Sequence, residues 1–230
     1  MSGSTVRIKI CGLTRVDEAL ACLHAGADWI GLNFHPRSSR FVPRERAREI
    51  ISAVADPARV VGLFVDLPAD EVGEIALGLG LQIVQLHGRE PALDLLALAR
   101  FHIIRAFRLG RLADIQEMLA YLERAQTLGR PPDAVLVDAA VPGQAGGTGT
   151  LVAEDILDLL PPLPRLILAG GLDARNVAAR IRRVRPWMVD VASGVEAAPG
   201  RKDLAQVDAF IRSARSVPLD EMVDNHLVEG

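Results

Sequence analysis

Short aliphatic runs alternate with amphipathic segments along most of this chain. Eight runs rich in Val, Ile and Leu have the length of buried β-strands, and they occupy residues 6–11, 29–34, 60–65, 82–86, 102–106, 134–138, 166–169 and 188–191. Between them, good helix formers or apolar residues spaced i, i+3, i+4 predict helices over residues 17–23, 44–51, 91–99, 113–126, 176–184 and 202–214. The pattern therefore predicts a strand–helix unit that is repeated along the chain.

Strict alternation of strands and helices predicts parallel strands joined by right-handed connections. Eight units is the number at which such a sheet closes into a barrel, and a doubly wound open sheet is the alternative. Polar residues inside the runs favour the barrel, because a fully buried open sheet accommodates them less easily: Lys9, Gln85, Arg105 and Asp138. We therefore expect an α/β protein, a single parallel eight-stranded (β/α)8 or TIM barrel over residues 1–215. Residues 216–230 match no unit, and we expect this tail to be partly disordered.

Composition and charge exclude several classes of protein. Of the 230 residues, 50% are hydrophobic and 24% are charged, which excludes wholesale disorder. The net charge of −3 argues against general nucleic-acid binding. No apolar run reaches the roughly 18 residues that cross a bilayer, and the N-terminus has no signal-peptide pattern. Cys11 and Cys22 are too few for a disulfide framework. We expect a cytoplasmic protein with neither nucleic acid nor membrane as a partner.

Reactive groups in barrels gather beyond the C-terminal ends of the strands. Cys11 ends the first run and Asp138 ends the sixth, so these two side chains are candidates for acid–base chemistry. Lys9 precedes Cys11 by two residues and shares its face of the strand, where an ammonium group would favour the thiolate. The alternatives stay open: Cys11 as a small buried apolar residue and Asp138 as a cap on the following loop.

Glycine turns follow the seventh and eighth runs, at Gly170-Gly171 and at Ser193-Gly194. Bare backbone N–H groups at a helix start bind anions, and barrels often hold a phosphate group after these two strands. The alternative is that the glycines only permit tight turns. The Gly146–Gly149 stretch matches neither a Walker A loop nor a dinucleotide-binding fingerprint.

Three further observations concern binding. Arg40, with Arg37 nearby, offers a planar donor pair suited to a carboxylate, although a solvated basic loop is the alternative. His87, after the fourth run, is a candidate for orienting a substrate or for a structural role. The five histidines are scattered without metal-ligand spacing, so we expect no metal site.

Taken together, the strand-end motifs resemble those of the phosphoribosylanthranilate isomerase family, which are (β/α)8-barrel enzymes of tryptophan biosynthesis. The resemblance follows family order from about residue 6 to residue 214. The matching motifs are Lys9-Ile10-Cys11-Gly12, Phe34 with Ser38-Ser39-Arg40, Gly62-Leu63-Phe64-Val65, Gln85-Leu86-His87-Gly88, Asp138 with Gly146-Gly147-Thr148-Gly149, Leu168-Ala169-Gly170-Gly171-Leu172 and Asp190-Val191-Ala192-Ser193-Gly194-Val195-Glu196.

The resemblance implies an Amadori rearrangement of N-(5′-phosphoribosyl)anthranilate to 1-(2-carboxyphenylamino)-1-deoxyribulose 5-phosphate. It implies that Asp138 is the general acid that opens the ribose ring and that Cys11 is the general base that removes the C2′ proton. Arg40 would contact the anthranilate carboxylate, and Asp190 would touch a sugar hydroxyl. No cofactor is required, because the nitrogen of the substrate itself supplies the iminium group.

The remaining expectations concern the ligand and its partners. The resemblance assigns the phosphate group to Gly171, Ser193 and Gly194. From their positions in the sequence, we also expect Lys9 and His87 to bind the substrate. The partner is then a small phosphorylated substrate, and the chain a monomer or a homodimer. The alternatives are a non-catalytic sugar-phosphate-binding barrel and another sugar-phosphate isomerase or epimerase barrel. The paired histidines that the epimerases use for a metal are absent from the sequence.

Overall fold

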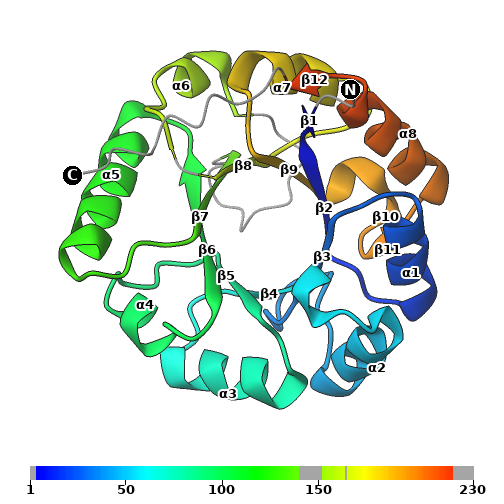
Figure 1. Cartoon of the computed structure of the whole chain (residues 1–230), viewed down its shortest axis with the longest axis horizontal. Helices are drawn as coiled ribbons and strands as arrows, with labels where there is room; N and C mark the ends of the chain where they lie inside the picture. Colours follow the sequence, from blue (N-terminus) through cyan, green and yellow to red (C-terminus); the bar gives the residue numbers. More distant parts are fainter. Residues whose placement is uncertain (1–3, 140–151, 164, 220–230) are drawn as a thin grey trace.

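Eight parallel strands close into a barrel, and the connecting helices surround it as an outer ring (Figure 1). This computed structural model describes residues 4–139, 152–163 and 165–219. Each strand pairs with its neighbours in chain order, and the last closes onto the first. The strands are β2 (Arg7–Cys11), β3 (Trp29–Asn33), β4 (Val60–Phe64), β5 (Ile83–Leu86), β6 (His102–Leu109), β7 (Ala134–Ala139), β8 (Leu166–Leu168) and β9 (Met188–Val191). The predicted parallel eight-stranded barrel is confirmed.

Eight α-helices are present in the described residues, whereas the sequence pattern named six. They are α1 (Val16–His24), α2 (Arg44–Val54), α3 (Ala69–Leu79), α4 (Asp94–Ala97), α5 (Leu112–Thr127), α6 (Glu154–Asp158), α7 (Val177–Val184) and α8 (Leu204–Arg215). The two that were not predicted are α3, which contains two glycines, and α6, which is a single turn of five residues. The predicted segment 91–99 keeps its α-helix only at α4.

Two small antiparallel pairs were also not predicted. A short hairpin of β10 (Glu196–Ala198) and β11 (Arg201–Lys202) follows β9 and the 3₁₀ turn η2 (Ser193–Val195). Lys202, expected as the start of the last helix, lies in this hairpin instead. The helix begins after Asp203, because that carboxylate accepts the N–H groups of Ala205 and Gln206 as an N-cap.

The two ends of the described chain lie together. Strand β1 (Ser4–Thr5) pairs with β12 (Pro218–Leu219) beside the barrel (Figure 1). The folded unit therefore continues to Leu219, four residues beyond the expected boundary at residue 215. The rest of the predicted tail, residues 220–230, lies outside the described residues.

The barrel interior is apolar at one end and polar at the other. Trp29 and Trp187 meet edge to face, with ring centroids 5.4 Å apart, at the end where the strands begin. Above them lies a buried layer that includes Ile83, Leu136 and Met188. Because side chains alternate along a strand, the residues two positions further on also face inward, and there Lys9, Gln85, Asp138 and Asp190 are buried.

Arg105 does not belong to this interior. Its guanidinium group lies 4.9 Å from the ring centroids of both Phe107 and Tyr121, so it faces the outer helix α5. It pairs there with the buried carboxylate of Glu90 at 3.2 Å. The polar residues that favoured the barrel therefore comprise three inward-facing side chains and one on the outer face.

Candidate active site

The first part of the site is a buried ion pair at the ends of β2 and β9. Strand pairing places Lys9 opposite Asp190, and the ammonium group of Lys9 donates to both carboxylate oxygens at 3.1 Å. Cys11 follows on the same face of β2, where its Sγ lies over Gly31 of β3. A Cβ added to Gly31 would lie 2.7 Å from that sulfur. Glycine at this position therefore makes room for the thiol.

The ionisation of Cys11 depends on burial as well as on Lys9. Burial raises the pKa of the Cys11 thiol above its ordinary value, and Asp190 raises it further, although Lys9 and Lys202 lower it. Burial also acts to lower the pKa of Lys9, but Asp190 and Cys11 outweigh burial and raise it. The effect of Lys9 on Cys11 has the predicted sign. Desolvation of the thiolate is nevertheless the larger effect, so the net pKa of the Cys11 thiol is raised.

Arg40 crosses from the β3–α2 loop to the end of β2. A Cβ on Gly12 would lie 2.4 Å from Cδ of Arg40, so the arginine stem passes directly over the glycine backbone. The Nε and Nη2 groups of Arg40 donate to Glu196 at 2.8 and 2.7 Å. The donor pair thus binds a carboxylate, as its geometry suggested, but in this structure that carboxylate belongs to the β10–β11 hairpin.

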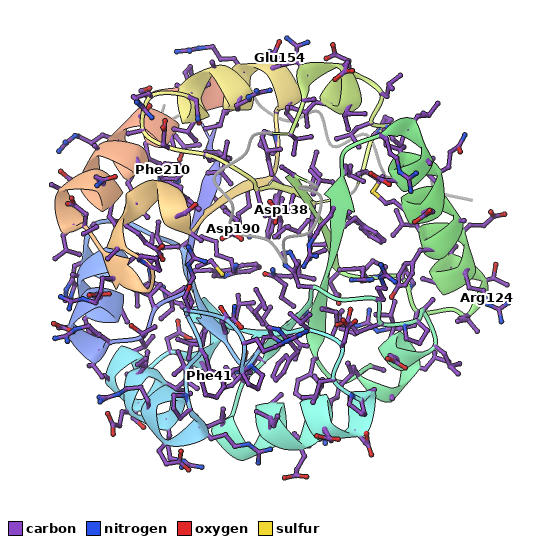
Figure 2. The ribbon with its side chains drawn as sticks, turned by 180° about the vertical axis from the view of Figure 1, so that it is seen from behind. Phe41, Arg124, Asp138, Glu154, Asp190 and Phe210 are labelled. Carbon is purple, nitrogen blue, oxygen red and sulfur yellow. The ribbon has the colours of Figure 1, made fainter. Side chains whose placement is uncertain are left out.

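The second part of the site lies at the ends of β5 and β7. Asp138 accepts the N–H of Ala139 at 2.8 Å through Oδ1, and its Oδ2 lies 3.5 Å from Nε2 of His87. Nδ1 of His87 in turn meets Nε2 of Gln85 at 2.9 Å. Gln85, His87 and Asp138 therefore form one inward-facing chain of polar groups. Figure 2 shows Asp138 and Asp190 both near the middle of the ring.

The glycine turns after β8 and β9 meet each other. Gly170 and Gly171 both have positive φ, at 82° and 61°. A Cβ on Gly194 would lie 1.9 Å from the carbonyl oxygen of Leu172, so η2 packs against the β8–α7 loop. A Cβ on Gly170 would lie 2.8 Å from Oδ1 of Asp138. The structure thus brings the two predicted anion-binding turns together, beside the candidate acid.

Comparison with known proteins identifies the family. The family model described as N-(5'phosphoribosyl)anthranilate (PRA) isomerase matches residues 8–213. A protein of that name from Chlorobaculum parvum is 41% identical over 218 residues, which cover 92% of this chain and 96% of the relative. The chain belongs to the phosphoribosylanthranilate isomerase family.

Solved structures of the family agree with the fold. The phosphoribosyl anthranilate isomerase from Thermotoga maritima is 34% identical with a TM-score of 0.78, over 92% of this chain and all of that one. Another phosphoribosyl anthranilate isomerase, 34% identical with a TM-score of 0.75 over the same shares, was solved in complex with reduced 1-(o-carboxyphenylamino)-1-deoxyribulose 5-phosphate. The resemblance seen in the strand-end motifs is therefore confirmed, and the chain is an isomerase of tryptophan biosynthesis.

Family membership does not by itself assign each residue of this chain. The expected site residues fall into two groups. The first group, at the ends of β2 and β9, contains Lys9, Cys11, Arg40 and Asp190. The second group contains Asp138 and His87, and the glycine turns with Gly171, Ser193 and Gly194 adjoin it. The Gly146–Gly149 turn lies outside the described residues. Within the described ranges, no three His, Cys, Asp or Glu side chains gather as a metal would require. Every helix in the same ranges is too short or too polar to span a bilayer.

Three polar residues around the site were not predicted as functional. Glu196 appeared only as the end of a motif, and Lys202 only as a helix start. Gln85 appeared as a polar residue inside a strand. The available signal was the alternation along β5, which places Gln85 and His87 on one face. For Glu196 and Lys202, only the fold itself reveals that Glu196 binds both Arg40 and Lys202.

Proposed function

We propose that this isomerase catalyses the Amadori rearrangement with Asp138 as general acid and Cys11 as general base. Both side chains come from inward-facing positions at the C-terminal ends of strands. Each belongs to a residue that is 7% exposed, so each is shielded from bulk water and still reaches the barrel mouth. This shared placement is the observation that supports the pair, and it disfavours a barrel that only binds a sugar phosphate.

The first step requires a proton donor at the ribose ring oxygen. Asp138 in its protonated form gives its proton to that oxygen while the C1′–O bond breaks. The lone pair of the anthranilate nitrogen forms the C1′=N bond, which gives an open-chain iminium ion. This transfer leaves Asp138 as a carboxylate. Nε2 of His87 lies 3.5 Å from that carboxylate, so His87 is the group placed to stabilise it as a donor.

The second step requires a base at C2′. Cys11 as thiolate removes the C2′ proton, and the C–H electrons form the C1′=C2′ bond while the iminium π electrons return to nitrogen. The resulting enolamine tautomerises to the ketone. Because burial raises the pKa of Cys11, the thiolate is a stronger base once it forms. The positive iminium group beside it favours that ionisation when it is needed.

The two ends of the substrate are anionic. Arg40 is positioned to bind the anthranilate carboxylate, and the backbone N–H groups of Gly171, Ser193 and Gly194 to bind the phosphate group. The Lys9–Asp190 pair lies between these ends, beside Cys11, where Asp190 is available to a sugar hydroxyl. Binding of the carboxylate at one end and of the phosphate group at the other would hold the ribose over Asp138 and Cys11.

The test separates chemistry from binding. Cys11→Ala and Asp138→Asn should each lower turnover by at least ~10²-fold, measured as loss of substrate fluorescence, because each removes one acid or base. The dissociation constant of the reduced product analogue, measured by calorimetry, should change by less than about threefold, since neither side chain anchors an anionic end of the ligand.

Cys22→Ala is the matched control, because Cys22 is fully buried on α1. It should turn over at the wild-type rate. Full activity of Cys11→Ala or Asp138→Asn would refute the role of that residue.

Assembly and location remain predictions. The Thermotoga maritima enzyme has been described as dimeric, which supports the homodimer over the monomer for this chain. Sedimentation at several protein concentrations tests that choice. A cytoplasmic location accords with a biosynthetic enzyme that acts on small phosphorylated metabolites.

A further inference from the structure

One carboxylate near the site is shared by two cations. Glu196 accepts from Nε and Nη2 of Arg40 at 2.8 and 2.7 Å, and from Nζ of Lys202 at 2.9 Å. The exposed fractions of the side chains are 14% for Arg40, 4% for Glu196 and 0% for Lys202. The three groups are thus largely desolvated, and their charges act on one another with little screening.

The charges of this cluster do not cancel. Arg40 and Glu196 alone would form a neutral pair, and a neutral pair attracts a substrate carboxylate weakly. Lys202 adds a second positive charge, so the three side chains together carry a net charge of +1. Glu196 occupies one edge of the guanidinium group, which leaves Nη1 without a hydrogen bond to any described residue.

The backbone holds Lys202 in this place. Its N–H donates to the buried carboxylate of Glu18 on α1 at 3.1 Å, and its Nζ also donates to the carbonyl of Ala192 at 3.0 Å. Ala192 immediately precedes the Ser193–Gly194 turn. Gly200, in the same hairpin, packs so closely against the Arg40 loop that an added Cβ would lie 2.9 Å from the carbonyl oxygen of Ser39. The hairpin therefore links the Arg40 loop to the predicted phosphate turn.

We propose that Lys202 is a positioning residue whose charge offsets Glu196, so that Glu196 can orient Arg40 without neutralising it toward the substrate carboxylate. This inference rests on the proposed role of Arg40. Glu196 fixes the direction of the guanidinium group, and Lys202 preserves its attraction for an anion. If Lys202 served only to hold the hairpin in place, its replacement would weaken the binding of all ligands alike.

Binding is the suitable readout, because Lys202 also lowers the pKa of Cys11 and its loss would disturb turnover directly. Two ligands are compared by calorimetry: reduced 1-(o-carboxyphenylamino)-1-deoxyribulose 5-phosphate, and the same compound without its carboxyl group. Lys202→Met should weaken binding of the first ligand roughly tenfold or more, since the cluster that attracts the ligand carboxylate loses one unit of positive charge. It should weaken the second ligand less than about threefold.

A double variant distinguishes charge balance from structure. Glu196→Gln combined with Lys202→Met returns the cluster to a net charge of +1, so affinity for the carboxylated ligand should recover to within about threefold of wild type. Arg201→Gln is the matched control, because Arg201 is the neighbouring hairpin residue and its exposed side chain pairs with Glu18, not with Glu196. It should leave both affinities unchanged.

Two results would overturn the proposal: equal weakening of both ligands by Lys202→Met, or no recovery in the double variant. If Lys202→Met does not fold, Lys202→Gln replaces it, because the amide can still donate to Ala192. Arg40→Gln separates this test from the proposed function. Equal loss of affinity for both ligands in that variant refutes the role of Arg40 itself. Selective loss of affinity for the carboxylated ligand supports that role, and the Lys202→Met result then decides the role of Lys202.

Discussion

Replacing Lys9 by Met should make Cys11 a much less reactive thiol. The ammonium group of Lys9 is the main group that favours the Cys11 thiolate against burial. Its removal also exposes Cys11 to the full charge of Asp190, which disfavours the thiolate further. Both effects act in the same direction, so the pKa of the Cys11 thiol should rise.

The size of the effect follows from the geometry of β2. Residues two apart on a strand are about 7 Å apart along the chain, and the two side chains share one face. At roughly 6 to 7 Å and an effective dielectric constant of about 20, two unit charges interact by about 2 to 3 kcal/mol. At a fixed pH below the thiol pKa, that energy corresponds to a thirty- to hundred-and-fiftyfold lower thiolate population.

Alkylation by iodoacetamide across pH 6 to 10 measures this population. The variant is built on Cys22→Ala, so that only Cys11 reacts. Removing one partner of the buried pair costs about 3 to 5 kcal/mol of stability, so a urea titration must first show that the protein is folded. The double variant Lys9→Met with Asp190→Asn isolates the effect of Lys9 from that of the unpaired carboxylate. Equal alkylation profiles of wild type and both variants would refute the electrostatic coupling.

Two further predictions concern the other contacts of the site. Gly194→Ala should raise the inhibition constant of inorganic phosphate at least tenfold, because its Cβ would lie 1.9 Å from the carbonyl oxygen of Leu172; Gly78→Ala, which meets no atom within 4 Å, is the control. Burial raises the pKa of Glu196, but Arg40 and Lys202 outweigh burial and hold it below its ordinary value of 4.5. A lowered carboxyl pKa stabilises the fold above pH 4.5, and this stability is lost as the pH falls through the folded-state pKa. Between pH 6 and pH 3 the urea midpoint of the wild type should therefore fall further than that of Glu196→Gln/Lys202→Met, and equal falls would contradict the assignment.

The strands were predictable because each is nearly continuous in apolar residues. In a parallel barrel a strand is covered by helices outside and by side chains inside, so both of its faces are buried. β6 shows where this signal ends. Its predicted end was residue 106, but it continues to Leu109, because Arg108 and Leu109 pair with Asp138 and Ala139 of β7. Arg108 is a polar residue at the barrel mouth, where the sequence alone does not distinguish the end of a strand from the start of a loop.

The helix α3 was missed although its sequence carries a helical signal. Val72, Ile75, Ala76 and Leu79 are buried at helical spacing, and Gly80 ends the helix in the left-handed conformation. Two glycines within it lower the intrinsic helix propensity by about 1 kcal/mol each. Packing against the barrel outweighs that cost, and this packing cannot be inferred from the composition of the helix alone. Helix α6 is too short to show any period.

The positions of the site residues were predictable, but the pairing of their charges was not. Strand ends meet at one end of a barrel whatever the loop sequences are, so Cys11, Asp138 and the glycine turns could be placed there from the pattern alone. Ion pairs depend on contacts between residues that are far apart in the chain: 181 positions for Lys9 and Asp190, and 156 for Arg40 and Glu196. A sequence shows which charges are present, and only the fold shows which of them already have a partner.

That difference changes how the chemistry of the site is understood. Lys9 next to Cys11 in sequence suggests an activated thiolate, whereas burial and the opposing charge of Asp190 give a thiol with a raised pKa. Arg40 alone suggests a free cation, whereas its pairing with Glu196 makes the net charge around it depend on Lys202. In both places the proposed function depends on the net charge of a buried group of three side chains. A substitution of the third member, which need not touch the substrate, should therefore alter the site as strongly as a substitution of a residue that does.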